Sequence, residues 1–203
     1  MAVRVTDRIK GRLDRVTVAR GRSHLLSMVP SGSICAEIGV WKGDFSQRIL
    51  DAVGPAELHL IDPWRSMQGH AYDDAWYGGK LEHGQADADA VHRGVLDRFA
   101  RTREQGVVQV HRLPSTEAAP HFPDAYFHFV YIDGNHYEEY VRADLAAWAP
   151  KVRPGGLIGG DDYGLEGWWD DGVTRAVDEF VRSGAAALVM IDHTQFALQI
   201  PDC

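Results

Sequence analysis

The chain has 203 residues, of which 45% are hydrophobic and 25% are charged, and these values are ordinary for a globular protein. We expect one domain over residues 1–203. No apolar run approaches the roughly 20 residues of a membrane helix, and a net charge of −8 argues against nucleic acid as the main partner. Cys35 lies in an apolar run and Cys203 is the last residue, so we expect no disulfide framework and a cytoplasmic protein.

Positive charge is concentrated at the N-terminus, which lacks the apolar stretch of a secretion signal. We predict a helical segment over residues 1–30. Its basic residues would lie on a solvated helix face, or they would dock on an acidic partner or on the chain's own acidic body. Within residues 1–22 the basic residues are Arg4, Arg8, Lys10, Arg12, Arg15, Arg20 and Arg22, against Asp7 and Asp14.

Predicted strands alternate with predicted helices along the rest of the chain. This order is typical of an α/β fold with a doubly wound, mostly parallel sheet of seven strands, Rossmann-like, whose last strand is antiparallel. The expected strands are residues 33–38, 57–62, 107–113, 127–132, 157–160, 187–191 and 195–200. The expected helices are residues 45–53, 137–148 and 173–181, with a turn at Pro154-Gly155-Gly156.

Residues 64–90 do not follow this alternation and are rich in Gly, Asp, His and aromatic residues. They come after the second strand, at the sheet edge where α/β proteins bind ligands. Long excursions at this edge are usually functional, so we predict a lid or substrate loop over 64–90. The alternative is a surface loop without a function.

The first motif with chemical content is the strand-to-helix turn that runs from Glu37 to Gly43. Gly39 and Gly43 would let the backbone approach a ligand closely, although any α/β protein can use glycine there. A carboxylate before the glycine would repel a pyrophosphate, and it favours a cationic ligand or one that offers an amine or hydroxyls. Asp62 ends the second strand, where a carboxylate can bind both hydroxyls of a ribose, in NAD as well as in other nucleosides. Trp64 would lie on an adenine face or simply pack in the core.

Acidic residues also follow the fourth and fifth strands. Asp133 ends the fourth strand, and Asp161 and Asp162 follow the fifth. Neighbouring carboxylates repel one another, and three oxygen ligands on one rim suit Mg²⁺. His136 has an unperturbed pKa near neutral pH and is a candidate catalytic base. The alternatives are solvated acidic loops and a structural histidine.

The segments EIGVWKGDFS, LHLIDPW and FVYIDGNHYEEYVRADLAAWAPKVRPGGLIGGDDY together resemble the class I S-adenosylmethionine-dependent methyltransferases, and most closely the macrocin and mycinamicin O-methyltransferase group. The resemblance covers about residues 33–182. It implies that Glu37 and Gly39 lie along the methionine end and the ribose of S-adenosylmethionine. It also implies that Asp62 holds the ribose hydroxyls and that Ser115 lies near the adenine.

The same resemblance implies roles at the reacting end. Asp133, Asp161 and Asp162 match the Mg²⁺ ligands of the family, and His136 matches the base of macrolide sugar methyltransferases. Some relatives lack this histidine and use an aspartate, so Asp133 is the other candidate for a catalytic base. The chain is shorter than the two-part macrolide enzymes, which leaves the acceptor open.

The sequence therefore predicts a metal-dependent O-methyltransferase of natural product biosynthesis that acts on a hydroxyl of a small molecule, such as a vicinal diol of sugar or phenolic type. The alternatives are N- or C-methyl transfer on the same fold, an NAD(P)-dependent oxidoreductase, and a non-catalytic subunit. The dinucleotide pattern Gly-x-Gly-x-x-Gly is not evident in the turn after the first strand, which disfavours the oxidoreductase. We expect neither nucleic acid nor a membrane as partner, and a homo-oligomer is left open.

Overall fold

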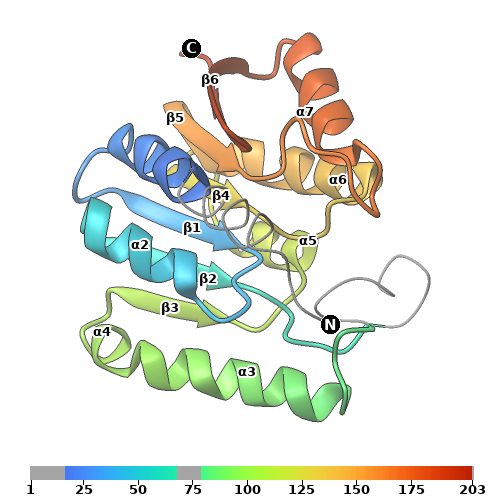
Figure 1. Ribbon diagram of the computed structural model, residues 1–203. Helices are drawn as coiled ribbons and strands as arrows, with labels where there is room; N and C mark the ends of the chain where they lie inside the picture. Colours follow the sequence, from blue (N-terminus) through green and yellow to red (C-terminus); the bar gives the residue numbers. More distant parts are fainter. Residues whose placement is uncertain (1–16, 68–78, 203) are drawn as a thin grey trace.

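The computed structural model describes residues 17–67 and 79–202, and its described part is built around one seven-stranded sheet (Figure 1). The strand order is β3-β2-β1-β4-β5-β7-β6. Neighbouring strands are parallel from β3 to β5, whereas β7 runs antiparallel to both β5 and β6. The strands are β1 Ile34–Ile38, β2 Glu57–Ile61, β3 Val108–His111, β4 Phe127–Ile132, β5 Val152–Gly160, β6 Ala187–Asp192 and β7 Gln195–Gln199. The predicted fold class and the antiparallel last strand are confirmed.

Helices cover both faces of this sheet. One core cluster joins α6 and α7 to the sheet, and a second joins residues 17–27, α2 and α3 to the opposite face. Successive residues of β1 point into different clusters, Cys35 into one and Ala36 into the other. Burial on both faces explains why the central strands are almost uninterruptedly apolar. The helices are residues 17–27, α2 Asp44–Val53, α3 Gln85–Arg98, α4 Ala100–Glu104, α5 Ser115–Ala118, α6 Glu138–Trp148 and α7 Gly172–Arg182, with 3₁₀ turns η2 Ala119–His121 and η3 Ala149–Lys151.

Two predictions from the sequence need correction. The expected turn at Pro154-Gly155-Gly156 lies inside β5. Gly155 has a φ of +72°, and the pairing of β4 with β5 shifts register in this stretch, so the strand is irregular here but does not end. The predicted loop 64–90 ends early, because α3 begins at Gln85. That helix buries only Ala88 and Val95, so its apolar stripe is too thin to be recognised in the sequence.

Other parts of these predictions lie outside the described residues. These are residues 1–16 of the expected N-terminal helix and residues 68–78 of the expected lid. Within the described residues, no helix is long and apolar enough to cross a membrane.

The strand order sets the place where α/β proteins have their ligand crevice, between the carboxyl ends of β1 and β4. The chain leaves β1 towards β2 on one side and leaves β4 towards β5 on the other, so β1 and β4 mark the point where the winding direction reverses. The backbone is unusually close here. A Cβ atom added to Gly39 would lie 2.1 Å from the carbonyl oxygen of Asp133, and Gly39 has a φ of +85°. Gly39 is therefore required by the packing of two loops, whether or not a ligand binds.

We predict that Gly39→Ala lowers the free energy of unfolding by about 3 kcal/mol, because the new methyl group meets backbone and the residue keeps a left-handed conformation. Gly32→Ala is the matched control. Gly32 has a φ of +75° but no atom within 4 Å of the added Cβ, so this variant reports backbone strain without the clash. Urea unfolding of both variants measures the difference, and equal losses would contradict the proposed clash.

A pair of histidines, one buried and one half-buried, joins β2 to β3 away from the ends of β1 and β4. His59 is 3% exposed, its Nδ1 lies 3.0 Å from Nε2 of His111, and its Nε2 lies 3.1 Å from Oε2 of Glu57. Burial lowers the pKa of His111 to about 4, and the neighbouring rings of His59 and His121 act in the same direction. The fold thus favours the neutral imidazole of His111.

We predict that the protein loses stability as the pH falls from 6.5 to 4, because the unfolded chain binds a proton on His111 in this range and the folded chain resists it. The melting temperature of His111→Gln should therefore fall less between pH 7 and pH 4.5 than that of the unmodified protein. His83→Gln, at an exposed histidine, is the control and should follow the unmodified protein. Parallel curves for all three would refute a role for His111.

Candidate active site

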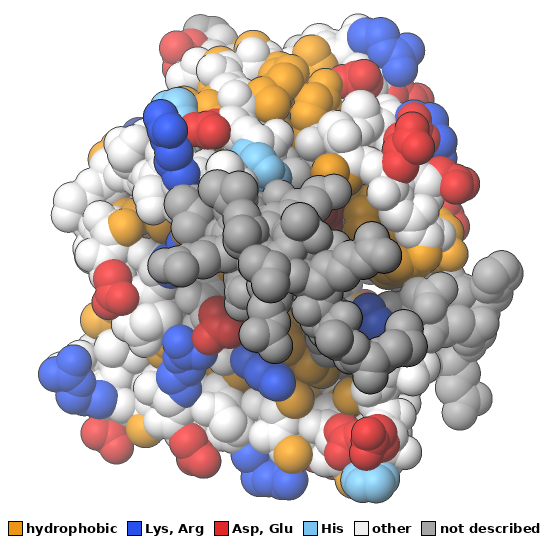
Figure 2. All heavy atoms as spheres, in the orientation of Figure 1, with side chains coloured by type: hydrophobic (Ala, Val, Ile, Leu, Met, Phe, Trp, Pro, Cys, Tyr) orange, Lys and Arg blue, Asp and Glu red, His pale blue; other side chains and the backbone are white. Residues whose placement is uncertain are grey.

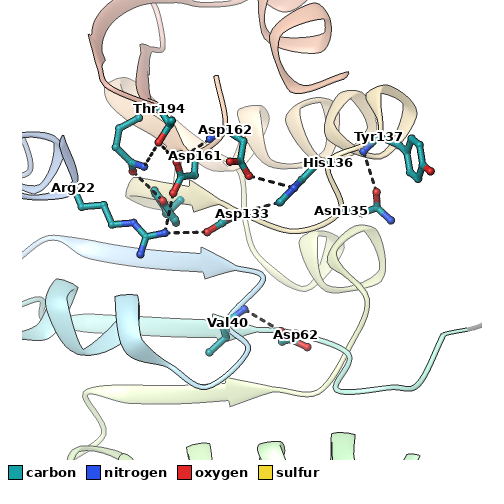
Figure 3. Close-up of polar contacts among 12 residues, drawn as sticks. Arg22, Val40, Asp62, Asp133, Asn135, His136, Tyr137, Asp161, Asp162 and Thr194 are labelled. Carbon is teal, nitrogen blue, oxygen red and sulfur yellow. Dashed lines mark hydrogen bonds and ion pairs between the residues drawn. The ribbon is translucent and has the colours of Figure 1, made fainter. Parts of the chain in front are cut away.

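The predicted catalytic and metal-binding residues converge at the carboxyl ends of β4 and β5, beside the crevice (Figure 3). The ring of His136 lies between two carboxylates. Its Nε2 is 3.4 Å from Oδ1 of Asp133, and its Nδ1 is 3.2 Å from Oδ2 of Asp162. One ligand atom from each of these three residues lies within 4.8 Å of the others, and all three side chains are partly buried.

Asp161 follows β5 and, with Asp133, His136 and Asp162, makes up what we call the rim. Its carboxylate, however, has other partners. Nη2 of Arg22 donates to Oδ2 of Asp161 at 2.8 Å and lies 3.5 Å from Oδ2 of Asp133. The hydroxyl of Thr194 and the backbone N–H of Asp162 both donate to Oδ1 of Asp161. Both oxygens of Asp161 are therefore engaged within the protein.

The three carboxylates differ in their electrostatic surroundings. Burial, with the charges of Asp133 and Asp161 and against the lowering effect of His136, raises the pKa of Asp162 to about 7. Burial would also raise the pKa of Asp161, but Thr194 and Arg22 hold it below its usual value. The ionised form is thus disfavoured at Asp162, whereas at Asp161 it is stabilised by Thr194 and Arg22.

The pKa of His136 reflects the same competition. Burial would lower it, but the carboxylate of Asp133, through a hydrogen bond and its charge, raises it above the usual value, with help from Asp162. Nδ1 of His136 is buried and has no aligned hydrogen bond among the described residues.

These residues fit a divalent cation. Asp133 and Asp162 offer hard oxygen ligands, with a nitrogen of His136 beside them. A cation would offset the burial and the repulsion that raise the pKa of Asp162. Asp161, the third carboxylate of the predicted set, lies on the same rim but is bonded to Arg22.

The predicted ribose-binding carboxylate holds the turn after β1. Oδ2 of Asp62 accepts the backbone N–H groups of Val40 at 2.9 Å and Trp41 at 3.0 Å, and Oδ1 accepts that of Trp64 at 2.8 Å. Asp62 is 1% exposed. The side chain therefore fixes the shape of the glycine turn, and its role towards a ribose stays a prediction.

Glu37 lies at the carboxyl end of β1 and is 2% exposed. Its carboxyl group accepts a hydrogen bond from the hydroxyl of Ser46 on α2. Burial raises the pKa of Glu37 to about 8, and the hydrogen bond from Ser46 opposes this shift. Glu37 is thus a candidate for holding a proton at neutral pH, unless a cationic ligand approaches it.

The three remaining predicted cofactor residues pack within the protein. Gly43 precedes α2 with a φ of +78°, and a Cβ there would meet the ring of Phe99 at 2.6 Å. Trp64 is fully buried, and its Nε1 donates to the carbonyl oxygen of Trp41. The hydroxyl of Ser115 accepts a hydrogen bond from Nε1 of Trp148 at 2.8 Å. Their contacts to a cofactor stay predictions.

The sequence analysis missed two contributors to the rim, Arg22 and Thr194. Arg22 was noted only as part of the basic N-terminal run, although docking on the chain's own acidic body was one of the alternatives given for that run. Thr194 precedes β7 without any motif that marks it.

On the face shown in Figure 2, the acidic and basic side chains of the described residues are interspersed, without the basic stripe of a nucleic-acid site.

Comparisons with known proteins agree with this architecture. The structure resembles the O-methyltransferase NovP with a TM-score of 0.57 and 21% identity, over 93% of this chain and 80% of that chain. It resembles the N-methyltransferase NodS from Bradyrhizobium japonicum WM9 with a TM-score of 0.56 and 15% identity, over 91% and 97% of the two chains. It resembles geranyl diphosphate methyltransferase, in complex with GPP and sinefungin, with a TM-score of 0.59 and 9% identity, over 89% and 78%.

At these identities the likeness concerns the fold alone. No curated protein matches the chain. A family model described as "Methyltransferase domain" matches residues 36–163, which is more than half of the 203 residues and includes the glycine turn and all three rim aspartates. The chain therefore belongs to this methyltransferase-domain family and is an S-adenosylmethionine-dependent methyltransferase of class I.

Proposed function

We propose that this methyltransferase transfers the methyl group to a hydroxyl of a small molecule with the help of a divalent cation, as in the macrocin and mycinamicin group. The observation that carries the proposal is the convergence of Asp133, His136 and Asp162 beside the crevice. An alcohol is a poor nucleophile at neutral pH and needs a group that lowers its pKa and a base that takes its proton. An amine needs to lose a proton but needs no metal to become a nucleophile, so a metal site favours oxygen as the acceptor atom.

The two ends of the crevice would have different tasks. At the end of β1, the turn that Asp62 holds would bind S-adenosylmethionine, whose sulfonium supplies the methyl group. At the ends of β4 and β5, Asp133 and Asp162 would hold Mg²⁺, with Asp161 as the third carboxylate. The cation would act as a Lewis acid on the acceptor hydroxyl. A second hydroxyl next to the first would chelate better, which favours a vicinal diol of sugar or phenolic type.

His136 would take the proton of the acceptor hydroxyl as the oxygen attacks the methyl carbon. Its ring is held between Asp133 and Asp162, so its position is fixed before an acceptor arrives. Such preorganisation contributes to catalysis because reacting groups need no further orientation. The cytoplasmic location and the small-molecule acceptor belong to the same proposal.

We predict that Asp162→Asn lowers the turnover by at least about 100-fold and leaves the binding of S-adenosylhomocysteine unchanged, because the residue lies on the metal side of the crevice. EDTA should abolish turnover, and added Mg²⁺ should restore it. Release of S-adenosylhomocysteine is measured with catechol and a panel of glycosides. Glu166→Gln, at an exposed residue of the loop after β5, is the control. Full turnover in EDTA would refute the metal role.

We predict that His136→Gln lowers kcat/KM by about 100-fold at pH 7 and by much less at pH 9, because hydroxide and solvent can replace a base when protons are scarce. The unmodified enzyme should gain activity as the pH rises through the pKa of its base, because only the neutral imidazole can take the proton of the hydroxyl. Profiles of kcat/KM against pH test this. Equal losses at both pH values would point to Asp133 as the base instead.

A further inference from the structure

Among the described residues of the basic N-terminal segment, Arg22 reaches the carboxylate rim. Arg22 lies on the helix of residues 17–27, and its guanidinium carbon is 5.0 Å from the centroid of the Phe45 ring. From this position Nη2 is 2.8 Å from Asp161 and 3.5 Å from Asp133 (Figure 3). The side chain is 23% exposed, so these contacts are mostly shielded from water.

Arg22 supplies the fixed positive charge of the rim. Of the described residues that form ion pairs with Asp133 or Asp161, it is the one whose charge does not depend on pH, because the other is His136. Burial would lower the pKa of Arg22, but Tyr131, Asp133 and Asp161 raise it instead, so it stays charged. The guanidinium therefore partly neutralises the same carboxylates that a divalent cation would use.

Arg22 and a divalent cation would compete for the carboxylate of Asp161. Its Oδ1 is taken by Thr194 and by the backbone of Asp162, and its Oδ2 is taken by Arg22. A cation that binds Asp161 would compete with the guanidinium for Oδ2, because the two positive charges repel one another there. The long, unbranched stem of arginine allows this exchange without a movement of the helix.

We propose that Arg22 is a built-in competitor of the divalent cation: it occupies Asp161 and Asp133 when the metal is absent and is released from them when the metal binds. The inference rests on the proposed metal role and adds a residue from outside the matched family segment. The competition lowers the metal affinity. Without a metal, the charge of Arg22 reduces the repulsion between Asp133 and Asp161. A purely structural arginine, which only ties the helix to the sheet, would affect stability but not metal affinity.

The test is the affinity for Mn²⁺ alone, measured by electron paramagnetic resonance without cofactor or acceptor. Arg22→Met keeps an apolar stem on the Phe45 ring and removes the charge, and it should bind Mn²⁺ at least about tenfold more tightly than the unmodified protein. Arg20→Met is the matched control. Arg20 lies on the same helix and is exposed, so this variant changes the net charge equally and should leave the affinity unchanged.

Arg22→Lys gives an independent reading, because lysine keeps the charge but loses the planar fork, and it should bind Mn²⁺ about two- to fivefold more tightly. Circular dichroism shows whether each variant is folded, and Arg22→Lys decides the test if Arg22→Met is not. Unchanged affinity in both Arg22 variants would overturn the competition and leave the metal role standing. Absence of Mn²⁺ binding in every variant would overturn the metal role together with the competition.

Discussion

The rim of this methyltransferase depends on the repulsion among three carboxylates that the sheet forces together. Ile132 of β4 pairs with Gly160 of β5, so Asp133 and Asp161 leave two adjacent parallel strands at the same level. Glycine is required at position 160 in this register, because a Cβ there would meet the ring of Phe196 at 2.5 Å. Negative charge is therefore built into this edge, and the side chains around it act mainly by compensating it.

The compensation explains why the rim residues have such different properties. Burial and like charges keep the pKa of Asp162 near neutrality, whereas Thr194 and Arg22 hold the pKa of Asp161 below its usual value. His136 gains a proton affinity that burial alone would have removed. The proposed divalent cation would shift all of these balances at once, because its charge would act on every carboxylate of the rim.

The sequence predicted what local patterns and parallel topology determine together. Apolar strands and their order place Asp133 and Asp161 at one edge without any knowledge of side-chain positions. The pairing of Arg22 with Asp161 spans 139 residues and depends on how a helix packs, which no local pattern encodes. Asp62 was predicted as a ligand-binding carboxylate, but the sequence could not show that backbone N–H groups of the glycine turn would surround it.

Arg22 also gives a physical meaning to the uneven charge of the chain. A net charge of −8 with a basic N-terminal segment first suggested a solvated face or a docking arm. At least one of these basic residues reaches the acidic body of its own chain, where water is largely excluded and an ion pair is stronger than at the surface. The helix of residues 17–27 is thereby coupled electrostatically to Asp133 and Asp161, which follow β4 and β5. A change in charge at the rim therefore changes the electrostatic energy of that helix, because Arg22 belongs to the helix and pairs with Asp161.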